Sequence, residues 1–171
     1  MADVCEMKVI DITDKPEMDT PFEKIAYSSE IYPIEYVPNF HELEYFVHID
    51  RGREAVLAMR ELMLASQPDA VFPLEMRTVA ADTAYLSPQY GMPTLVLSVS
   101  GKPGTDYWDY LRSVDALLGE FDARVHWGKL HFLTAEQLHD RYPKAPAFIG
   151  IRRRLDPDGV FLNDHLRPLF A

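Results

Sequence analysis

The chain has 171 residues, of which 47% are hydrophobic, and a net charge of −10 from 27 acidic and 17 basic residues. This composition supports one folded domain and does not favour nucleic acid or an anionic membrane as partner, because both require concentrated positive charge. The single cysteine, Cys5, excludes an internal disulfide and a cysteine metal cluster. No apolar run reaches membrane-spanning length and the N-terminus has no signal pattern, so we expect a cytoplasmic location.

The first elements are expected within residues 1–66. Residues 1–24 are acidic and contain turn-forming prolines, so we expect an extension with a short strand at 8–12. Residues 42–49 alternate between polar and apolar side chains, which is typical of a half-buried strand. A helix capped by Asp50 is expected over 51–66, because its apolar residues fall mostly on one side.

Two more strands and a second helix follow. Strands fit residues 71–80 and 94–100, which a turn-rich loop separates. A helix is expected from Thr105 or Asp106 to about Phe121, since its apolar residues recur at helical spacing. The order strand, helix, strand, strand, helix predicts an α+β fold in which a mostly antiparallel sheet carries helices on one face.

The C-terminal part predicts a helical tail. Thr134 and Gln137 have the spacing of a capping box for a short helix through about Arg141. Another helix is expected over 147–155, after two interrupting prolines, and it ends at the turn-forming run 156–159. We therefore predict three regions, an extension at 1–24, an α+β domain at 25–123 and a C-terminal segment at 124–171.

A carboxylate and a guanidinium occur together in the expected strand 71–80. Glu75 and Arg77 are two residues apart, so a strand directs both side chains to the same face. Such a pair can bind a polyhydroxylated ligand through charged hydrogen bonds. An exposed ion pair without function is the more common arrangement, because surface ion pairs are frequent and only weakly stabilising.

A second polar group surrounds a glycine in residues 125–131. Lys129 could stabilise negative charge and His126 or Trp127 could border a planar cofactor, while Gly128 allows close approach of the backbone. The alternative is a core tryptophan with polar neighbours in a loop, and the residues alone favour neither interpretation.

Other motifs are weaker. The run 156–159 contains the Asp-x-Asp-Gly that begins some calcium loops, but the later glutamate is missing, so we expect no metal site. The sequence also lacks a nucleophile elbow and a phosphate-binding Gly-rich loop. Chemistry is therefore expected at the two polar groups described above.

Together these segments resemble the C-terminal part of the FAD-linked family of D-arabinono-1,4-lactone oxidase, L-gulonolactone oxidase and alditol oxidase, within the vanillyl-alcohol-oxidase-like flavoproteins. The resemblance follows the family's order and spacing over about residues 25–171. The matching pieces are Glu42-Leu-Glu-Tyr-Phe-Val47, Phe72-Pro-Leu-Glu-Met-Arg77, Ala80-Ala-Asp82, Leu86-Ser-Pro88, His126-Trp-Gly-Lys129 and Ile151-Arg-Arg-Arg-Leu-Asp-Pro-Asp-Gly-Val-Phe-Leu-Asn-Asp164.

The resemblance implies a cap domain whose sheet covers the flavin ring, followed by a tail that packs on an FAD-binding domain. It implies that Arg77 and Lys129 favour alkoxide character at the reacting alcohol, while Glu75 accepts hydrogen bonds from substrate hydroxyls. The further residues that it implies are Ser98 and Ser100 for substrate binding, and His126, Trp127, Gly128 and Asn163 for cofactor binding.

The family's N-terminal FAD-binding domain has no counterpart in this sequence, so we expect FAD binding only with a partner or a further domain. The leading interpretation is the substrate-side portion of an FAD-dependent oxidoreductase that oxidises a CH–OH group of a sugar-1,4-lactone or polyol. The expected partners are a separate FAD-binding chain or a second copy. Two alternatives are a non-catalytic module that binds a sugar acid or lactone, and a scaffold that self-associates through the cap.

Overall fold

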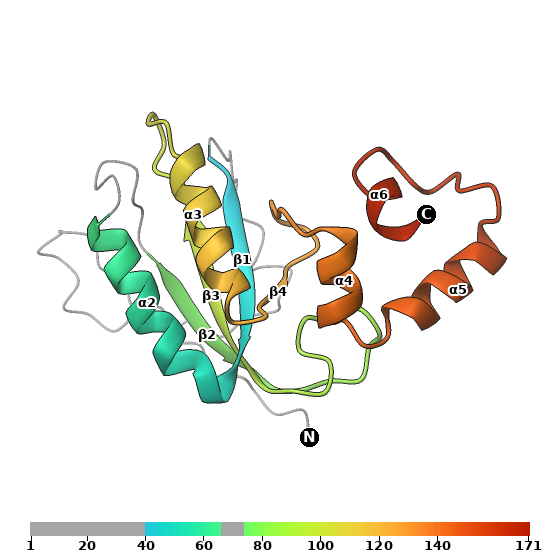
Figure 1. The fold of residues 1–171 in the computed structure, drawn as a ribbon, viewed down its shortest axis with the longest axis horizontal. Coiled ribbons are helices and arrows are strands. Elements are labelled where there is room, and N and C mark those ends of the chain that lie inside the picture. The colour runs from blue at the N-terminus through green and yellow to red at the C-terminus, as the bar shows by residue number, and fades with distance from the viewer. Residues whose placement is uncertain (1–39, 66–73) are drawn as a thin grey trace, which may run out of the picture. The chain divides into compact units, whose positions relative to one another are not determined.

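The computed structural model describes residues 40–65 and 74–171, which belong to one compact unit. The expected extension at 1–24, with its strand at 8–12, lies outside the described residues. A four-stranded sheet and five α-helices make up this part of the chain (Figure 1). The elements are β1 (Glu42–His48), the 3-10 helix η1 (Ile49–Arg51), α2 (Gly52–Ala65), β2 (Glu75–Val79), β3 (Thr94–Ser100), α3 (Trp108–Gly119), β4 (Arg124–Val125), α4 (Ala135–Arg141), α5 (Ala145–Leu155) and α6 (Arg167–Phe170).

The sheet is antiparallel and has the strand order β2-β3-β1-β4. In the register, Glu44 lies opposite Ser98 of β3, and Ser98 lies opposite Glu75 of β2. Paired residues share a face of the sheet, so these three side chains lie on the same face. The α+β fold with a mostly antiparallel sheet is thereby confirmed.

The other face of the sheet carries the hydrophobic core. Leu43, Tyr45 and Val47 alternate with Glu44 and Phe46 along β1 and are fully buried. They pack against α2 and α3, which lie on this side of the sheet (Figure 1). Burial of apolar surface stabilises a fold by roughly 25 cal/mol per Å², so this layer supplies much of the driving force for folding.

The predicted helices and strands of this layer are confirmed with small shifts. The helix expected over 51–66 is α2, but Asp50 is not its cap, because Asp50 lies in η1 and its N–H donates to His48 Nδ1 at 3.2 Å. The strand expected over 71–80 is described from residue 74 and forms β2. The helix expected from residue 105 begins at Trp108 as α3.

The C-terminal tail is helical, as expected. Thr134 and Gln137 form both capping-box hydrogen bonds at the start of α4, of 3.0 and 3.2 Å. Pro146 does not interrupt the next helix but lies in the first turn of α5, where a missing N–H costs no helical hydrogen bond. None of the described helices is long and apolar enough to cross a membrane.

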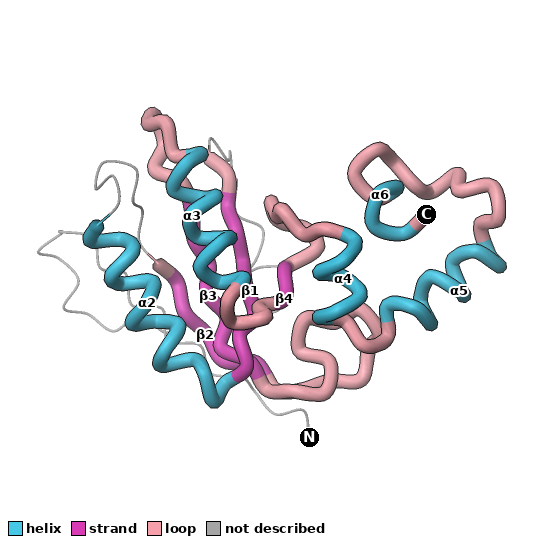
Figure 2. The backbone as a smooth tube through the Cα atoms, viewed as in Figure 1, coloured by secondary structure: helices cyan, strands magenta, loops and turns pink. Residues whose placement is uncertain are grey.

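One arginine joins the tail to the sheet. Arg124 of the two-residue strand β4 donates from Nε to the carbonyl oxygen of Arg141, at the end of α4, at 2.7 Å. Its Nη1 donates to the carbonyl oxygens of Pro88 and Tyr90, at 3.2 and 2.9 Å. Pro88 and Tyr90 belong to the loop between β2 and β3, part of the pink tube in Figure 2, so one side chain ties three segments together.

Candidate active site on the polar face of the sheet

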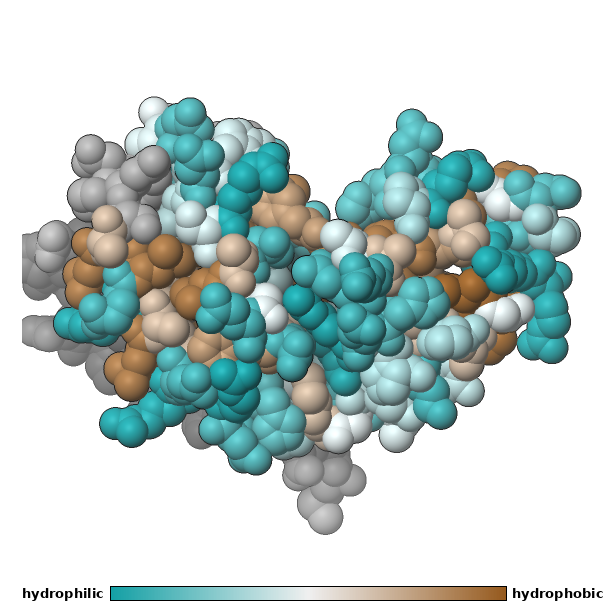
Figure 3. All heavy atoms as spheres, in the orientation of Figure 1, coloured by the Kyte–Doolittle hydropathy of each residue, from teal (hydrophilic) through white to brown (hydrophobic). Residues whose placement is uncertain are grey.

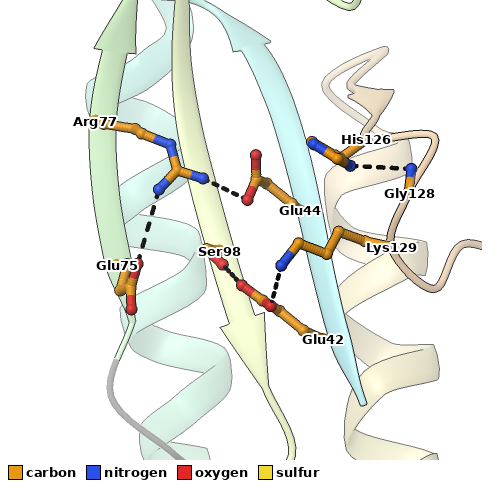
Figure 4. A network of polar contacts seen from close by, with 8 residues as sticks. All are labelled: Glu42, Glu44, Glu75, Arg77, Ser98, His126, Gly128 and Lys129. Carbon is orange, nitrogen blue, oxygen red and sulfur yellow. Dashed lines mark hydrogen bonds and ion pairs between the residues drawn. The ribbon is translucent and has the colours of Figure 1, made fainter. Parts of the chain in front are cut away.

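Charged and hydroxyl side chains gather on the face of the sheet that α2 and α3 do not cover. The central strand β1 contributes Glu42 and Glu44, β2 contributes Glu75 and Arg77, and β3 contributes Ser98, as Figure 4 shows. The period-two alternation of strands explains this placement, because Glu42 and Glu44 flank the buried Leu43 on β1 and share the face opposite to it. We call this set, together with Lys129, the polar cluster.

Arg77 holds one side of the polar cluster together. Its Nη2 donates a hydrogen bond to Glu44 Oε2, and its Nη1 lies 3.7 Å from Glu75 Oε2 (Figure 4). The Glu44 side chain is only 4% exposed, whereas those of Arg77 and Glu75 are 49% and 73% exposed. The guanidinium therefore lies between a buried carboxylate and an exposed one, with part of its surface open to a ligand.

Lys129 and Ser98 hold Glu42 from two sides. Lys129 Nζ donates to Glu42 Oε2, and the Ser98 hydroxyl donates to Glu42 Oε1 (Figure 4). Burial raises the pKa of the Glu42 carboxyl, but the hydrogen bonds from Lys129 and Ser98 outweigh burial, so the pKa lies below its ordinary value. Glu42 is thus ionised at neutral pH and pairs with the Lys129 ammonium.

The loop after β4 brings Lys129 to this position. His126 N–H donates to the carbonyl oxygen of Glu44 at 3.0 Å, and Leu130 N–H donates to that of Glu42 at 3.0 Å. A turn between them is closed by the Lys129 N–H, which donates to the His126 carbonyl at 3.1 Å. Residues 126–130 therefore run beside β1, and Lys129 projects over its carboxylates.

His126 borders the polar cluster with a defined protonation pattern. Gly128 N–H donates to His126 Nδ1 at 3.0 Å, so Nδ1 is an acceptor and the neutral ring carries its proton on Nε2. The ring stacks on Phe46, with centroids 6.5 Å apart and planes 24° apart. A Cβ atom on Gly128 would lie 3.1 Å from His126 Cε1, so the glycine permits this close approach. His126 can therefore offer a hydrogen-bond donor beside the polar cluster.

The polar cluster combines cations with an exposed carboxylate, a set of groups that can bind a polyhydroxylated ligand. Two cations with part of their surface exposed can stabilise negative charge on a substrate oxygen, and the exposed Glu75 can accept a hydrogen bond from a hydroxyl. Ser100 lies on the same face, opposite Glu42. Across residues 40–65 and 74–171, no three or more His, Cys, Asp or Glu side chains are arranged so that they could hold a metal ion.

A family profile described as D-arabinono-1,4-lactone oxidase matches residues 17–169. The chain belongs to this lactone oxidase family. Individual relatives agree with the profile. The L-gulono-1,4-lactone dehydrogenase of Mycobacterium tuberculosis (strain H37Rv) is 39% identical over 128 residues, which are 75% of this chain and 30% of that protein.

Two further relatives come from a Streptomyces species and from Mus musculus. The alditol oxidase of a Streptomyces species is 34% identical over 134 residues, covering 78% of this chain and 30% of the oxidase. The L-gulonolactone oxidase of Mus musculus is 30% identical over 157 residues, covering 86% and 35%. The chain thus spans about a third of the length of the curated relatives that it matches.

Only part of the site that the sequence predicts comes together in the structure. Trp127 lies apart from the polar cluster, because its indole N–H donates to the Leu86 carbonyl at 2.8 Å and its ring packs on Tyr142 and Phe170. Asn163 is exposed in the tail, where its side-chain oxygen accepts from Leu166 N–H at 2.8 Å. Their cofactor roles stay predictions.

Two residues of the polar cluster were absent from the sequence-based site. In the sequence, Glu42 and Glu44 are the polar positions of an alternating strand and belong to a segment that resembles the family, but no role in the site was predicted for them. Their signal was present, since two carboxylates at i and i+2 on a strand that becomes central are unusual unless cations neutralise them. Arg77 pairs with Glu44, and Lys129 pairs with Glu42. Each cation that was predicted from the sequence therefore contacts a carboxylate that was not.

Proposed function

We propose that this chain is the substrate-side portion of an FAD-dependent oxidoreductase that oxidises a CH–OH group of a sugar-1,4-lactone or polyol. The observation that carries the proposal is the convergence of Arg77 and Lys129 on one face of the sheet, next to the exposed Glu75. Membership of the lactone oxidase family supports the choice of reaction and of substrate class.

The residues of the polar cluster divide the work on the substrate. Arg77 and Lys129 donate hydrogen bonds to the oxygen of the reacting carbon and stabilise the negative charge that develops on it. Glu75 accepts a hydrogen bond from a neighbouring hydroxyl and so orients the sugar chain. His126 donates from Nε2 at the border of the site, where it fixes the position of the substrate or of the cofactor ring.

The residues that the structure describes fit the reacting end of such a site and not the nucleotide end. When bound, the flavin supplies the hydride acceptor, and its chemistry is that of the cofactor. The sequence contains no phosphate-cradling Gly-rich loop. The proposal therefore includes a further polypeptide segment, on a separate chain or elsewhere in a longer one, that holds the adenine dinucleotide.

The C-terminal segment offers a surface for that segment. A pocket of about 290 Å³ between the β2–β3 loop and the tail is lined by Leu86, Trp127, Phe148 and other apolar residues. Phe161, which also lines this pocket, is 82% exposed, and its neighbour in the chain, Val160, is 78% exposed. Apolar surface also shows among polar side chains over the tail in Figure 3. Exposed apolar patches of this kind mark interaction sites, and we assign this one to the flavin-binding polypeptide.

Reconstitution with FAD tests the proposal. The purified chain is incubated with FAD, alone and with the N-terminal portion of the mycobacterial relative as a separate polypeptide, and passed over a gel filtration column. We expect flavin absorption to co-elute with the pair and to bleach anaerobically on addition of a sugar lactone or an alditol. Flavin retention without bleaching by either substrate class would contradict the proposed reaction, and absence of flavin in both preparations would contradict the proposed cofactor.

Variants sharpen this test. Arg77→Met and Lys129→Met each remove one cation, and we expect the rate of flavin reduction to fall by about 10²–10³-fold, as for other single donors to a developing oxyanion. Arg60→Met is the matched control, because Arg60 is an ion-paired, exposed arginine on α2. A similar loss in Arg60→Met would show that the effect is not local to the polar cluster.

A further inference from the structure

The charges of the polar cluster do not balance. Glu42, Glu44 and Glu75 supply three carboxylates, whereas Arg77 and Lys129 supply two cations, so the cluster has a net charge of −1. His126 adds no charge in the neutral form that its hydrogen bond from Gly128 requires. By its net charge, the polar cluster is therefore not an anion-binding site, although it contains two cations.

The carboxylates of β1 lie beneath the cations. The side chains of Glu42 and Glu44 are 19% and 4% exposed, whereas those of Lys129 and Arg77 are 33% and 49% exposed. A ligand on this face therefore meets the cations first and the carboxylates behind them. Because partly buried charges are screened less than exposed ones, both carboxylates reduce the attraction that a ligand anion feels.

The carboxylates neutralise the charge of the cations without using all the hydrogen-bond donors of Arg77. A guanidinium has five N–H donors, so Arg77 keeps donors beyond those that reach Glu44 and Glu75. These donors suit hydroxyl and carbonyl oxygens, which need hydrogen bonds but no net charge. Without Glu42 and Glu44, the same two cations would attract a carboxylate strongly.

We propose that Glu42 and Glu44 are specificity-determining residues that make the polar cluster select uncharged polyhydroxylated ligands and reject the aldonate with the same carbon skeleton. The inference rests on the proposed function in taking the polar cluster as the substrate site, and it concerns ligand charge rather than the reaction. A lactone and its hydrolysed acid differ in this charge, so the two carboxylates distinguish a substrate from its own breakdown product.

Ser98 supports this selection as a positioning residue. The family resemblance implies a substrate contact for its hydroxyl, but in the structure Ser98 is 3% exposed and donates to Glu42 Oε1. Lys129 takes the other oxygen, so both carboxylate oxygens are fixed. Ser98 therefore holds the carboxylate that neutralises Lys129.

Binding measurements on the full chain test the selection without turnover. Xylitol and xylonate are the probes, because they share a five-carbon skeleton and differ in charge, and binding is followed by NMR chemical shift titration. We expect wild type to bind xylitol more tightly than xylonate. Glu42→Gln and Glu44→Gln should each raise the ratio of the affinity for xylonate to that for xylitol on the order of tenfold, which corresponds to about 1.4 kcal/mol.

A matched control is Glu61→Gln, which removes a carboxylate that pairs with Arg60 on α2 and should change neither affinity. Equal affinity of wild type for both probes, an unchanged affinity ratio in both glutamine variants, or no binding of either probe by any variant overturns the selection. If Glu44→Gln does not fold, Glu42→Gln carries the test, because Glu42 is more exposed. Probe selection without flavin reduction would instead contradict the proposed function and leave the selection standing.

Discussion

The two sides of strand β1 bury different kinds of side chain. On one side, Leu43 and Tyr45 are fully buried against the helices. On the other side, Glu44 is almost as buried, but it is a carboxylate that depends on Arg77. Buried apolar groups stabilise a fold directly, whereas a buried ion pair offsets its own desolvation at best. The comparison indicates that the helix side of β1 serves stability and the polar side serves ligand recognition.

The largest expected effect is a loss of stability when a core side chain is removed from the helix side of β1. Leu43→Ala removes a fully buried side chain from the core and leaves a cavity, so we expect a loss of about 2–5 kcal/mol in the free energy of unfolding, measured by urea denaturation. Leu57→Ala on α2 is the control, because Leu57 is 50% exposed. If the two variants lose equal stability, the helix side of β1 is not the main source of stability.

A smaller effect is expected on the polar side. Glu44→Gln keeps the shape of the side chain, removes a desolvated charge and leaves a half-exposed arginine that water can solvate. We expect a change of about 1 kcal/mol in the free energy of unfolding, of either sign, by the same denaturation experiment. A loss as large as that of Leu43→Ala would show that the polar cluster is itself a main source of stability.

The pH dependence of stability sharpens the comparison further. The pKa of Glu42 lies below its ordinary value of 4.5, so the ion pair with Lys129 stabilises the fold above that value, and this contribution is lost as the pH falls through the lower, folded-state pKa. We expect Lys129→Met to weaken the acid-induced loss of stability in urea denaturation between about pH 6 and about pH 3. An unchanged pH profile would contradict the pairing, and Lys102→Met, which removes an exposed lysine, is the control.

The smallest effect is expected at the border of the site. Gly128→Ala places a Cβ atom 3.1 Å from His126 Cε1, so the imidazole must move by a few tenths of an ångström. We expect a loss below about 1 kcal/mol together with a change in the ¹⁵N chemical shifts of the ring. Gly150→Ala in α5, where a Cβ atom meets nothing within 4 Å, should instead stabilise by roughly 0.5–1 kcal/mol. Unchanged ring shifts in Gly128→Ala would show that the close approach does not fix the imidazole.

Most of the fold was predictable because its signals are local. The alternation in β1, the apolar sides of α2 and α3 and the capping box of α4 depend on residues within a few positions of one another. The strand β4 and the helix α6 were not predicted, since two and four residues are too few for a periodic pattern. Tertiary contacts define such short elements, and a single sequence does not reveal them.

The candidate site was predictable in its cations and not in their partners. The spacing of Glu75 and Arg77 predicts a shared face, and the structure confirms it. The pairing of Lys129 with Glu42 joins residues 87 positions apart and depends on the strand order. The position of Trp127 was not predictable either, because its ring packs on Tyr142 and Phe170 of the tail, residues that only the fold brings next to it.

Arg124 has a consequence for how the sequence of this fold can vary. Its guanidinium reaches carbonyl oxygens at residues 88, 90 and 141 at once, so both segments must keep these atoms within about one hydrogen-bond length of the same group. We expect few insertions or deletions in the stretches that join these carbonyls to the sheet. Where one occurs in the β2–β3 loop, we expect a compensating change before α4. Length variation among homologous sequences should therefore be correlated across two loops that lie about 40 positions apart in the chain.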